Sequence, residues 1–289
     1  FPIWFLSEWP EELKADAIAK EYEEWMRERW NHPCVVIWDA QNESNSEETG
    51  KALMKVRHLD LSNRPWDNGW ATPQRETDTI EVHPYFFISD TFNDNPFKME
   101  TLADHSGIPG VSAVQKDLQN PMILNEYAWL WLNRDGSETS LTRKVYHNLL
   151  GPNSTTEQRR EIYARYLAAQ TEFWRSHRHC AGVLHFCGLG YARPGGQTSD
   201  NFVALDPPTF EPNFFRYVRD AFAPVGVAID FWAEEQPAGP PRKQAIPVVV
   251  INDLDKEWAG PVTLRLLGDG RTLFEQTQDA RVAPLGREV

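Results

Sequence analysis

The sequence predicts an α/β fold built from βα units around a parallel sheet, followed by a smaller all-β region. Two observations carry this prediction. Over residues 10–186, short apolar runs alternate with amphipathic helical segments, which is the pattern of a parallel sheet covered by helices. After residue 224, strand-like runs follow one another with turns but no helix between them. We therefore divide the chain into domains 1–223 and 224–289.

Three segments have the periodicity of amphipathic helices. In residues 10–31, apolar side chains recur every three or four positions between charged ones. A second, weaker helical segment covers residues 48–56. The third covers residues 157–178, and Ser154 with Glu157 fits a capping box at its start.

Five short apolar runs separate or follow these helices. Residues 34–38 form a continuous apolar run, which predicts a strand buried on both faces with Cys34 inside. Further strands are expected near residues 59–61, 79–82, 121–124 and 181–186. Polar residues directly follow several of these runs, and parallel α/β enzymes place their chemistry at that end of the strands. In the all-β region, strands are expected at residues 225–232, 246–251, 262–267 and 271–276, as part of a β-sandwich.

The composition excludes several classes of protein. The chain of 289 residues has a net charge of −13 and no basic run, which argues against a nucleic-acid partner. No apolar stretch approaches the roughly 20 residues of a membrane helix, so no membrane partner is expected. Gly188 and Gly190 lack the third glycine of a dinucleotide fingerprint, and no cofactor is expected.

Two glutamates stand out because each closes an Asn-Glu pair directly after an apolar strand. These are Glu43, after Asn42, and Glu126, after Asn125. Strand ends on one face of a barrel converge, so both carboxyl groups are expected to reach one pocket. A retaining glycosidase needs one carboxyl as acid and base and another as nucleophile, about 5–5.5 Å apart.

Two motifs resemble those of glycoside hydrolase family 2. The run 31–44 (NHPCVVIWDAQNES) is similar to the acid/base signature of that family, and 121–127 (PMILNEY) resembles its nucleophile strand. The Asn252-Asp253-Leu254 segment is similar to its C-terminal sandwich. The resemblance implies a partial (β/α)8 TIM barrel, about strands four to eight, followed by a truncated immunoglobulin-like sandwich. It also implies that the first half of the barrel lies in the parent chain or comes in trans, and that this fragment alone is inactive.

The resemblance assigns roles to individual residues. It implies that Glu43 is the general acid/base and Glu126 the nucleophile. The substrate-binding residues that it implies are Asn42, His83, Tyr85, Trp66, Asp67 and His185. His185 stands where the family usually has a tryptophan platform for the sugar. The Asn-x-Lys element of glucuronidases has no match at residues 201–203, which favours a β-galactoside-like substrate over a glucuronide.

Two functions from different classes remain. The first is a retaining exo-β-glycosidase that acts on an oligosaccharide or glycoside. The second is a non-catalytic carbohydrate-binding or interaction module on a degenerate glycosidase scaffold. A carboxyl separation of about 5 Å favours the enzyme, and one beyond roughly 9 Å excludes it. A metal site at His177, His179 and His185 is not expected, because no metal-binding motif is present. The compartment stays open, with periplasmic or extracellular as the first expectation.

Overall fold

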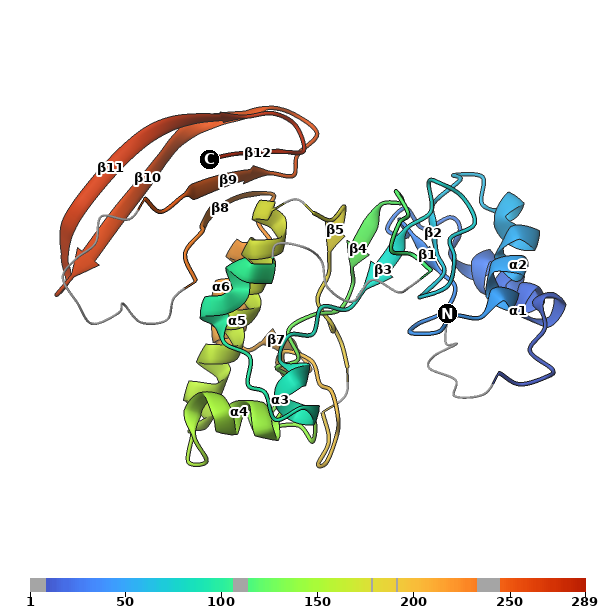
Figure 1. Cartoon of the computed structure of the whole chain (residues 1–289), viewed down its shortest axis with the longest axis horizontal. Helices are drawn as coiled ribbons and strands as arrows, with labels where there is room; N and C mark the ends of the chain where they lie inside the picture. Colours follow the sequence, from blue (N-terminus) through green and yellow to red (C-terminus); the bar gives the residue numbers. More distant parts are fainter. Residues whose placement is uncertain (1–8, 106–113, 178, 191, 233–244) are drawn as a thin grey trace. The chain divides into compact units, whose positions relative to one another are not determined.

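The computed structural model describes residues 9–105, 114–177, 179–190, 192–232 and 245–289. The chain forms two compact units that interleave along the sequence. The first unit consists of residues 1–84, 107–127 and 179–186, and the second contains the remainder (Figure 1). The domain boundary predicted between residues 223 and 224 lies inside the second unit and stays a prediction.

Five short parallel strands form the centre of the first unit. They are β1 (Trp38–Asp39), β2 (Trp66–Asp67), β3 (Ile80–Val82), β4 (Met122–Leu124) and β5 (Gly182–Val183). β1 pairs with β2, and β4 pairs with both β3 and β5. A parallel bridge between Asp67 and Thr79 joins β2 to β3. The strands therefore follow one another in chain order, as the sequence predicts for successive βα units, and their carboxyl ends share one edge.

Two helices cover the first two strands of this unit (Figure 1). They are α1 (Ala15–Arg29) and α2 (Glu47–Val56), close to the predicted segments. Tyr22 of α1 and the paired Trp38 and Trp66 are completely buried, and the two indole rings stack at 5.9 Å between centroids. Rings of this size bury enough apolar surface to fix the helices on the strands.

Two sequence predictions in this unit are wrong. The strand expected at residues 59–61 is absent, because Arg57–Leu59 forms a 3-10 helix and the strand follows later, at β2. The run 34–38 contributes only its last residue to a strand, and Cys34 and Val36 are exposed. Within the described residues β1 pairs with β2 alone, so no neighbouring strand covers its other side.

The second unit contains the remaining helices. They are α3 (Ile88–Phe92), the 3-10 helix Met99–His105, α4 (Arg143–Leu150), α5 (Thr156–His177) and α6 (Pro212–Ala221). The capping box of α5 is displaced by one residue from its predicted position. The backbone N–H of Gln158 donates to the Thr155 hydroxyl, and the Thr155 N–H donates to the Gln158 side chain. No helix among the described residues is long and apolar enough to cross a membrane.

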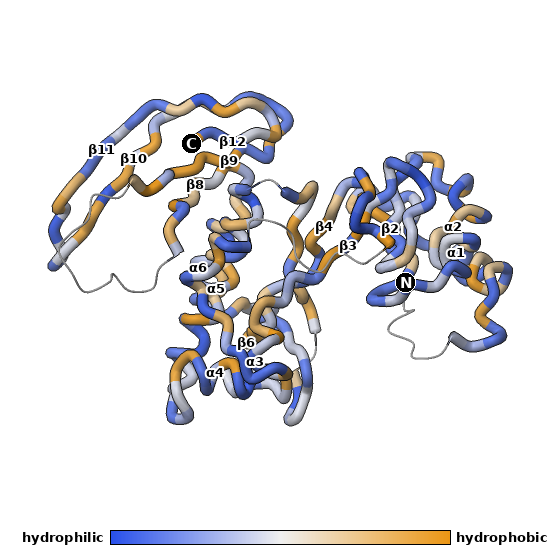
Figure 2. Tube along the Cα trace, in the orientation of Figure 1, coloured by the Kyte–Doolittle hydropathy of each residue, from blue (hydrophilic) through white to orange (hydrophobic). Residues whose placement is uncertain are grey.

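The strands of the second unit are antiparallel. β6 (Phe202–Leu205) pairs with β7 (Pro208–Phe210), and β9 (Val248–Asn252) lies between β8 (Val225–Ile229) and β12 (Gly286–Glu288). A long hairpin joins β10 (Trp258–Gly268) to β11 (Arg271–Val282). Figure 2 shows a mostly hydrophobic β9 and a mostly hydrophilic β11. The four predicted strands are therefore present, and the immunoglobulin-like arrangement stays a prediction.

Candidate active site

Glu43 lies in the loop that follows β1, and its backbone is strained. Its φ is +49°, a left-handed conformation that residues with a Cβ seldom adopt. Such outliers persist only where surrounding contacts hold them, and they gather at functional sites. Two hydrogen bonds hold the loop in this conformation. Within the loop, the Ser44 hydroxyl donates to the Asn42 carbonyl, and from the loop after β2 the Trp70 N–H donates to the Ser44 carbonyl.

The loop after β2 approaches this loop closely at a glycine. Gly69 has φ +57°, and a Cβ placed there would lie 2.8 Å from both Cγ and the carbonyl oxygen of Gln41 and 3.0 Å from the Ser44 carbonyl. Gln41 is completely buried and donates from its amide to the Asn68 carbonyl at 3.0 Å. The two loops therefore contact each other at a position where only glycine fits. Because Gly69 packs against Gln41 and Ser44, this contact restrains the loop that carries Glu43.

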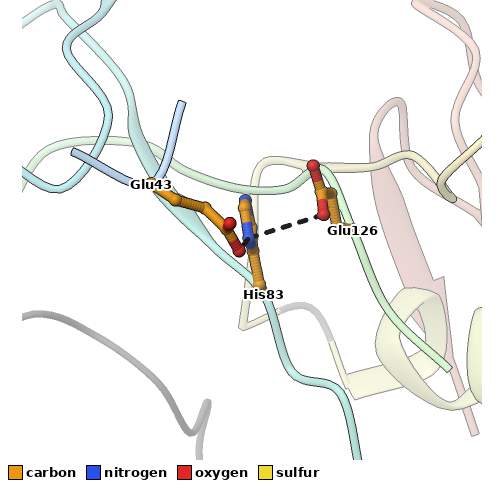
Figure 3. Close-up of side chains that lie close together, drawn as sticks. All are labelled: Glu43, His83 and Glu126. Carbon is orange, nitrogen blue, oxygen red and sulfur yellow. Dashed lines mark hydrogen bonds and ion pairs between the residues drawn. The ribbon is translucent and has the colours of Figure 1, made fainter. Parts of the chain in front are cut away.

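Glu126 follows β4 directly, next to the end of β3. The register pairs Val82 with Leu124, so His83 and Asn125 are the next residues along two adjacent parallel strands. This register brings the side chain of His83 between the two glutamates, which come from strand ends far apart in the sequence (Figure 3).

The three side chains form one compact group. Nδ1 of His83 lies 2.9 Å from Oε1 of Glu43 and 3.6 Å from Oε2 of Glu126 (Figure 3). The ligand-type atoms of the three residues all lie within 4.8 Å of one another. One carboxylate oxygen of Glu43 and one of Glu126 therefore lie within 4.8 Å of each other, so the two carboxyl groups share one site.

The glutamates remain accessible although the histidine is buried. The side chain of Glu43 is 22% exposed and that of Glu126 is 14% exposed, whereas that of His83 is 5% exposed. Glu43 forms an ion pair with His83, yet this pair is not sealed beneath the surface. Both carboxylates can therefore meet a small molecule from solvent.

The charge of His83 follows from its neighbours. Burial alone would lower its pKa, but hydrogen bonding to Glu43 and Glu81 and the negative charge of Glu126 raise the pKa of His83 to about 10. Its ring is therefore an imidazolium at neutral pH. An adjacent cation favours the ionised form of both catalytic candidates.

A second set of carboxyl groups lies at the ends of the neighbouring strands. Burial and the negative charge of Glu81 raise the pKa of Asp39 to about 7, and the same two causes raise the pKa of Asp67 well above its usual range. Glu81 lies in the middle of β3 and is completely buried. The strands thus bring several acidic groups around a single histidine.

Two of the predicted substrate-binding residues are buried. Trp66 lies in the apolar core against Trp38 with no exposed surface, which does not favour its predicted contact with substrate. Asp67 is 5% exposed and accepts hydrogen bonds from the Gly69 N–H and the Thr79 hydroxyl, so it shapes the turn after β2 instead. Both belong to β2 itself and do not follow it.

The other three predicted contacts stay predictions. Asn42 is half-buried beside Glu43 in the loop after β1. Tyr85 belongs to the second unit, where it packs edge-on against Trp129 with 5.0 Å between ring centroids. His185, just after β5, is half-buried, and burial lowers its pKa to about 4, so it is neutral at pH 7.

Sequence reasoning missed Glu81 and Gly69. Glu81 carried a signal, because a charged residue alternates with Ile80 and Val82 in an otherwise apolar strand and must point to the opposite face. Gly69 carried none, since its role depends on a loop that is distant in the sequence.

The same three residues also satisfy a simple criterion for a metal site. Among the described residues, Glu43, His83 and Glu126 are the group whose ligand atoms lie close enough to hold an ion. Imidazole and carboxylate together suit divalent transition metals. A metal at Nδ1 of His83 would have to displace a proton bound with a pKa of about 10. The expectation that His177, His179 and His185 hold no metal stays a prediction.

Comparison with known proteins identifies the family. Residues 7–150 match the model of the glycosyl hydrolases family 2 TIM barrel domain. The chain belongs to glycoside hydrolase family 2. Residues 7–150, which include β1 to β4, accordingly belong to a TIM-barrel domain, and the scaffold is that of a glycoside hydrolase. No curated protein sequence gives a significant match.

Among solved structures, the chain is similar to β-glucuronidases of Bacteroides uniformis. A β-glucuronidase 2 covalently bound to cyclophellitol-6-carboxylate aziridine and a further β-glucuronidase each align with 14% identity and a TM-score of 0.42, over 98% of this chain and 35% of theirs. A calcium-binding mutant of β-glucuronidase 2 aligns with 15% identity and a TM-score of 0.44, over 98% of this chain and 34% of its own. The chain therefore spans about a third of the length of these structures.

Proposed function

We propose that this chain carries the catalytic pair of a retaining exo-β-glycosidase, with Glu126 as nucleophile and Glu43 as general acid/base. The observation that supports this assignment is the approach of the two carboxyl groups at the ends of parallel strands, where one oxygen of each lies within 4.8 Å of the other. Retaining glycosidases place their two carboxyl groups about 5–5.5 Å apart, and inverting enzymes about 6.5–9.5 Å apart, to leave room for a water molecule.

In the first step, Glu126 attacks the anomeric carbon and the bond to the leaving oxygen breaks. That oxygen takes the proton of Glu43, which leaves a glycosyl ester on Glu126. In the second step, Glu43 takes a proton from water, and the resulting hydroxide attacks the anomeric carbon and frees Glu126. The His83 imidazolium lies 3.6 Å from Glu126 and favours the ionised carboxylate that attack requires.

The first step needs a proton on Glu43 although His83 lies beside it. The negative charge of Glu126 favours that proton, because two carboxylates this close do not readily ionise together. Once Glu126 is esterified its charge is gone, and His83 then favours the ionised Glu43 that acts as base. The arrangement thus suits both halves of the cycle.

The substrate class follows from the family, and the sugar is a narrower proposal. A carbohydrate substrate is expected of a glycoside hydrolase. We expect a β-galactoside, because residues 201–203 lack the Asn-x-Lys element that would hold a glucuronate carboxyl group. Aryl β-galactosides and aryl β-glucuronides, compared with the intact protein, test this choice directly.

Covalent trapping tests the mechanism. A 2-deoxy-2-fluoro-β-glycosyl fluoride should add one sugar to the wild-type protein, and peptide mapping should place it on Glu126. Glu126→Gln should lose both labelling and turnover, whereas Glu76→Gln, an exposed residue of the same unit, should keep them. Labelling at another carboxylate would reject the assignment.

A second candidate is a carbohydrate-binding module without catalysis. The 2.9 Å pair between His83 and Glu43 favours it, because a neighbouring cation favours the ionised form of Glu43, which has no proton to donate to a leaving group. This function predicts that the wild-type protein binds the same glycosides in calorimetry, yet neither hydrolyses nor becomes labelled by them.

A further inference from the structure

The buried carboxylate of Glu81 contacts three parts of the site at once. Its Oε2 accepts a hydrogen bond from Nδ2 of Asn125 at 2.5 Å and lies 3.6 Å from Nε2 of His83. Its Oε1 accepts from the backbone N–H of Glu43 at 3.4 Å. These groups come from the loop after β1, from β3 and from the end of β4.

The Asn125 amide and the Glu43 N–H donate hydrogen bonds to Glu81, and the His83 ring forms an ion pair with it. A carboxylate only accepts hydrogen bonds, so the ionised form suits all three contacts. Glu81 is completely buried, and an ionised group without partners would be costly there. The contacts thus explain why a charged residue is tolerated inside an otherwise apolar strand.

The position of these contacts couples them to the catalytic pair. Asn125 directly precedes Glu126, and the Glu43 N–H belongs to the residue whose backbone is in the left-handed conformation. The hydrogen bond to Asn125 also occupies an amide donor that the sequence pattern alone would offer to a sugar hydroxyl. Glu81 thus binds the backbone N–H of Glu43 and the side chain of Asn125, the residue before Glu126.

We propose that Glu81 is a positioning residue, which sets the spacing of Glu43 and Glu126 by holding the Glu43 amide, the Asn125 side chain and the His83 ring together. The proposal rests on the proposed function for its effect on catalysis. Glu81 does not touch substrate in this scheme and acts through its three partners. The other titratable groups around it are Asp39 at the end of β1, Asp67 at the end of β2, Glu43 and Glu126.

Glu81→Gln is the direct test, because it keeps the shape and removes the charge. Every orientation of the new amide places its NH2 group against a donor, either the Glu43 N–H or Asn125. We expect kcat on the preferred aryl glycoside to fall about 100-fold or more with little change in KM, since geometry at the reacting centre is lost while substrate binding remains. The matched control is Glu172→Gln, a half-buried glutamate of α5 in the other unit.

A measurement without substrate separates the two proposals. In histidine-labelled protein, the NMR titration of His83, assigned with His83→Asn, should give a pKa well above neutrality. Glu81→Gln should lower it by about one unit or more, because one negative neighbour is gone. Asn125→Ala should leave that pKa in place and still lower kcat, and it introduces no buried mismatch. Circular dichroism melts verify that each variant folds.

Two outcomes distinguish the positioning role of Glu81 from the proposed hydrolase function. If Glu81→Gln folds, keeps wild-type kcat and is labelled on Glu126, the positioning role is wrong and the proposed function stands. If the wild-type protein neither turns over nor becomes labelled while Glu81→Gln still shifts the pKa of His83, the hydrolase function is wrong and the contacts of Glu81 stand.

Discussion

The strands of the first unit have two faces that differ sharply in chemistry. One face carries Trp38 and Trp66, which pack without solvent against the helices. The residues that follow them, Asp39 and Asp67, point to the other face together with Glu81. Residues that are adjacent in the sequence thus lie in an apolar core or in an acidic cluster, because successive side chains of a strand alternate between its two faces.

The comparison shows where this unit gains and loses stability. The aromatic face buries large apolar surfaces and stabilises the fold. The acidic face combines carboxyl groups that resist ionisation with a left-handed glutamate, and both features cost stability. Such costs are expected where a site is built for chemistry, so changes on the two faces should have opposite effects.

The largest effect is expected on the aromatic face. Trp66→Ala should lower the free energy of unfolding by about 3–5 kcal/mol, because it leaves a cavity in the core. Urea unfolding monitored by circular dichroism measures this loss. Trp66→Phe is the control, with a smaller loss, since the ring remains and the indole N–H has no hydrogen-bond partner in the described part of the chain. Equal losses for both variants would contradict this account of the aromatic face.

On the acidic face, a neutral substitution should stabilise. The pKa of Asp39 is raised to about 7, so the folded state holds its proton more tightly than the unfolded state. The contribution of Asp39 therefore falls as pH rises from about 4 through 7. Asp39→Asn should remove this fall and stabilise the protein at pH 8 by on the order of 2 kcal/mol.

Urea unfolding at pH 5 and pH 8 measures that difference. Asp117→Asn, an exposed aspartate of the same unit, is the control and should change neither value appreciably. The contribution of His83 also falls with pH, but in a higher range: its raised pKa of about 10 adds stability that is complete below pH 6.5 and is lost as pH rises through 10. Destabilisation by Asp39→Asn at pH 8 would show that its charge is compensated in the folded protein.

The contact of Gly69 with the loop of Glu43 leaves no room for a methyl group, so adding one should lower stability. Gly69→Ala adds a Cβ against Gln41 and Ser44 and should cost about 1–3 kcal/mol of stability, with a loss of activity through Glu43. Gly195→Ala is the control, because Gly195 has φ +68°, close to that of Gly69, and open space around it. The difference between the two thermal melts isolates the close approach from the backbone conformation. Identical melts would mean that the loops separate freely.

The smallest effect concerns the backbone at Glu43. Its φ of +49° predicts that Glu43→Gly is about 1 kcal/mol more stable than Glu43→Ala, since only the glycine adopts this conformation without strain. Both variants lose the contact with His83, so their difference reports the strain alone. Paired urea titrations measure it, and a more stable alanine variant would show that the loop relaxes.

Local pattern was sufficient for α1, α2 and α5 and for β3 and β4, but it did not indicate α3, α4 or α6. The periodicity of α1 and the apolar runs at β3 and β4 identified their elements because each reports the environment of its own residues. The pattern failed at residues 59–61, because so short an apolar run does not determine whether its residues form a strand or a 3-10 helix. Capping at Thr155 was missed by one residue for a related reason, as several nearby side chains can fill the same position.

The sequence by itself indicated the family and the candidate pair Glu43 and Glu126, because these depend on residue types next to apolar strands. Tertiary structure alone decided that His83 lies between them, that Glu81 contacts groups next to both and that Gly69 packs against the loop of Glu43. These features depend on the register of parallel strands and on approaches between distant loops. The residue pattern along one strand specifies neither the register with its neighbours nor the contacts between distant loops.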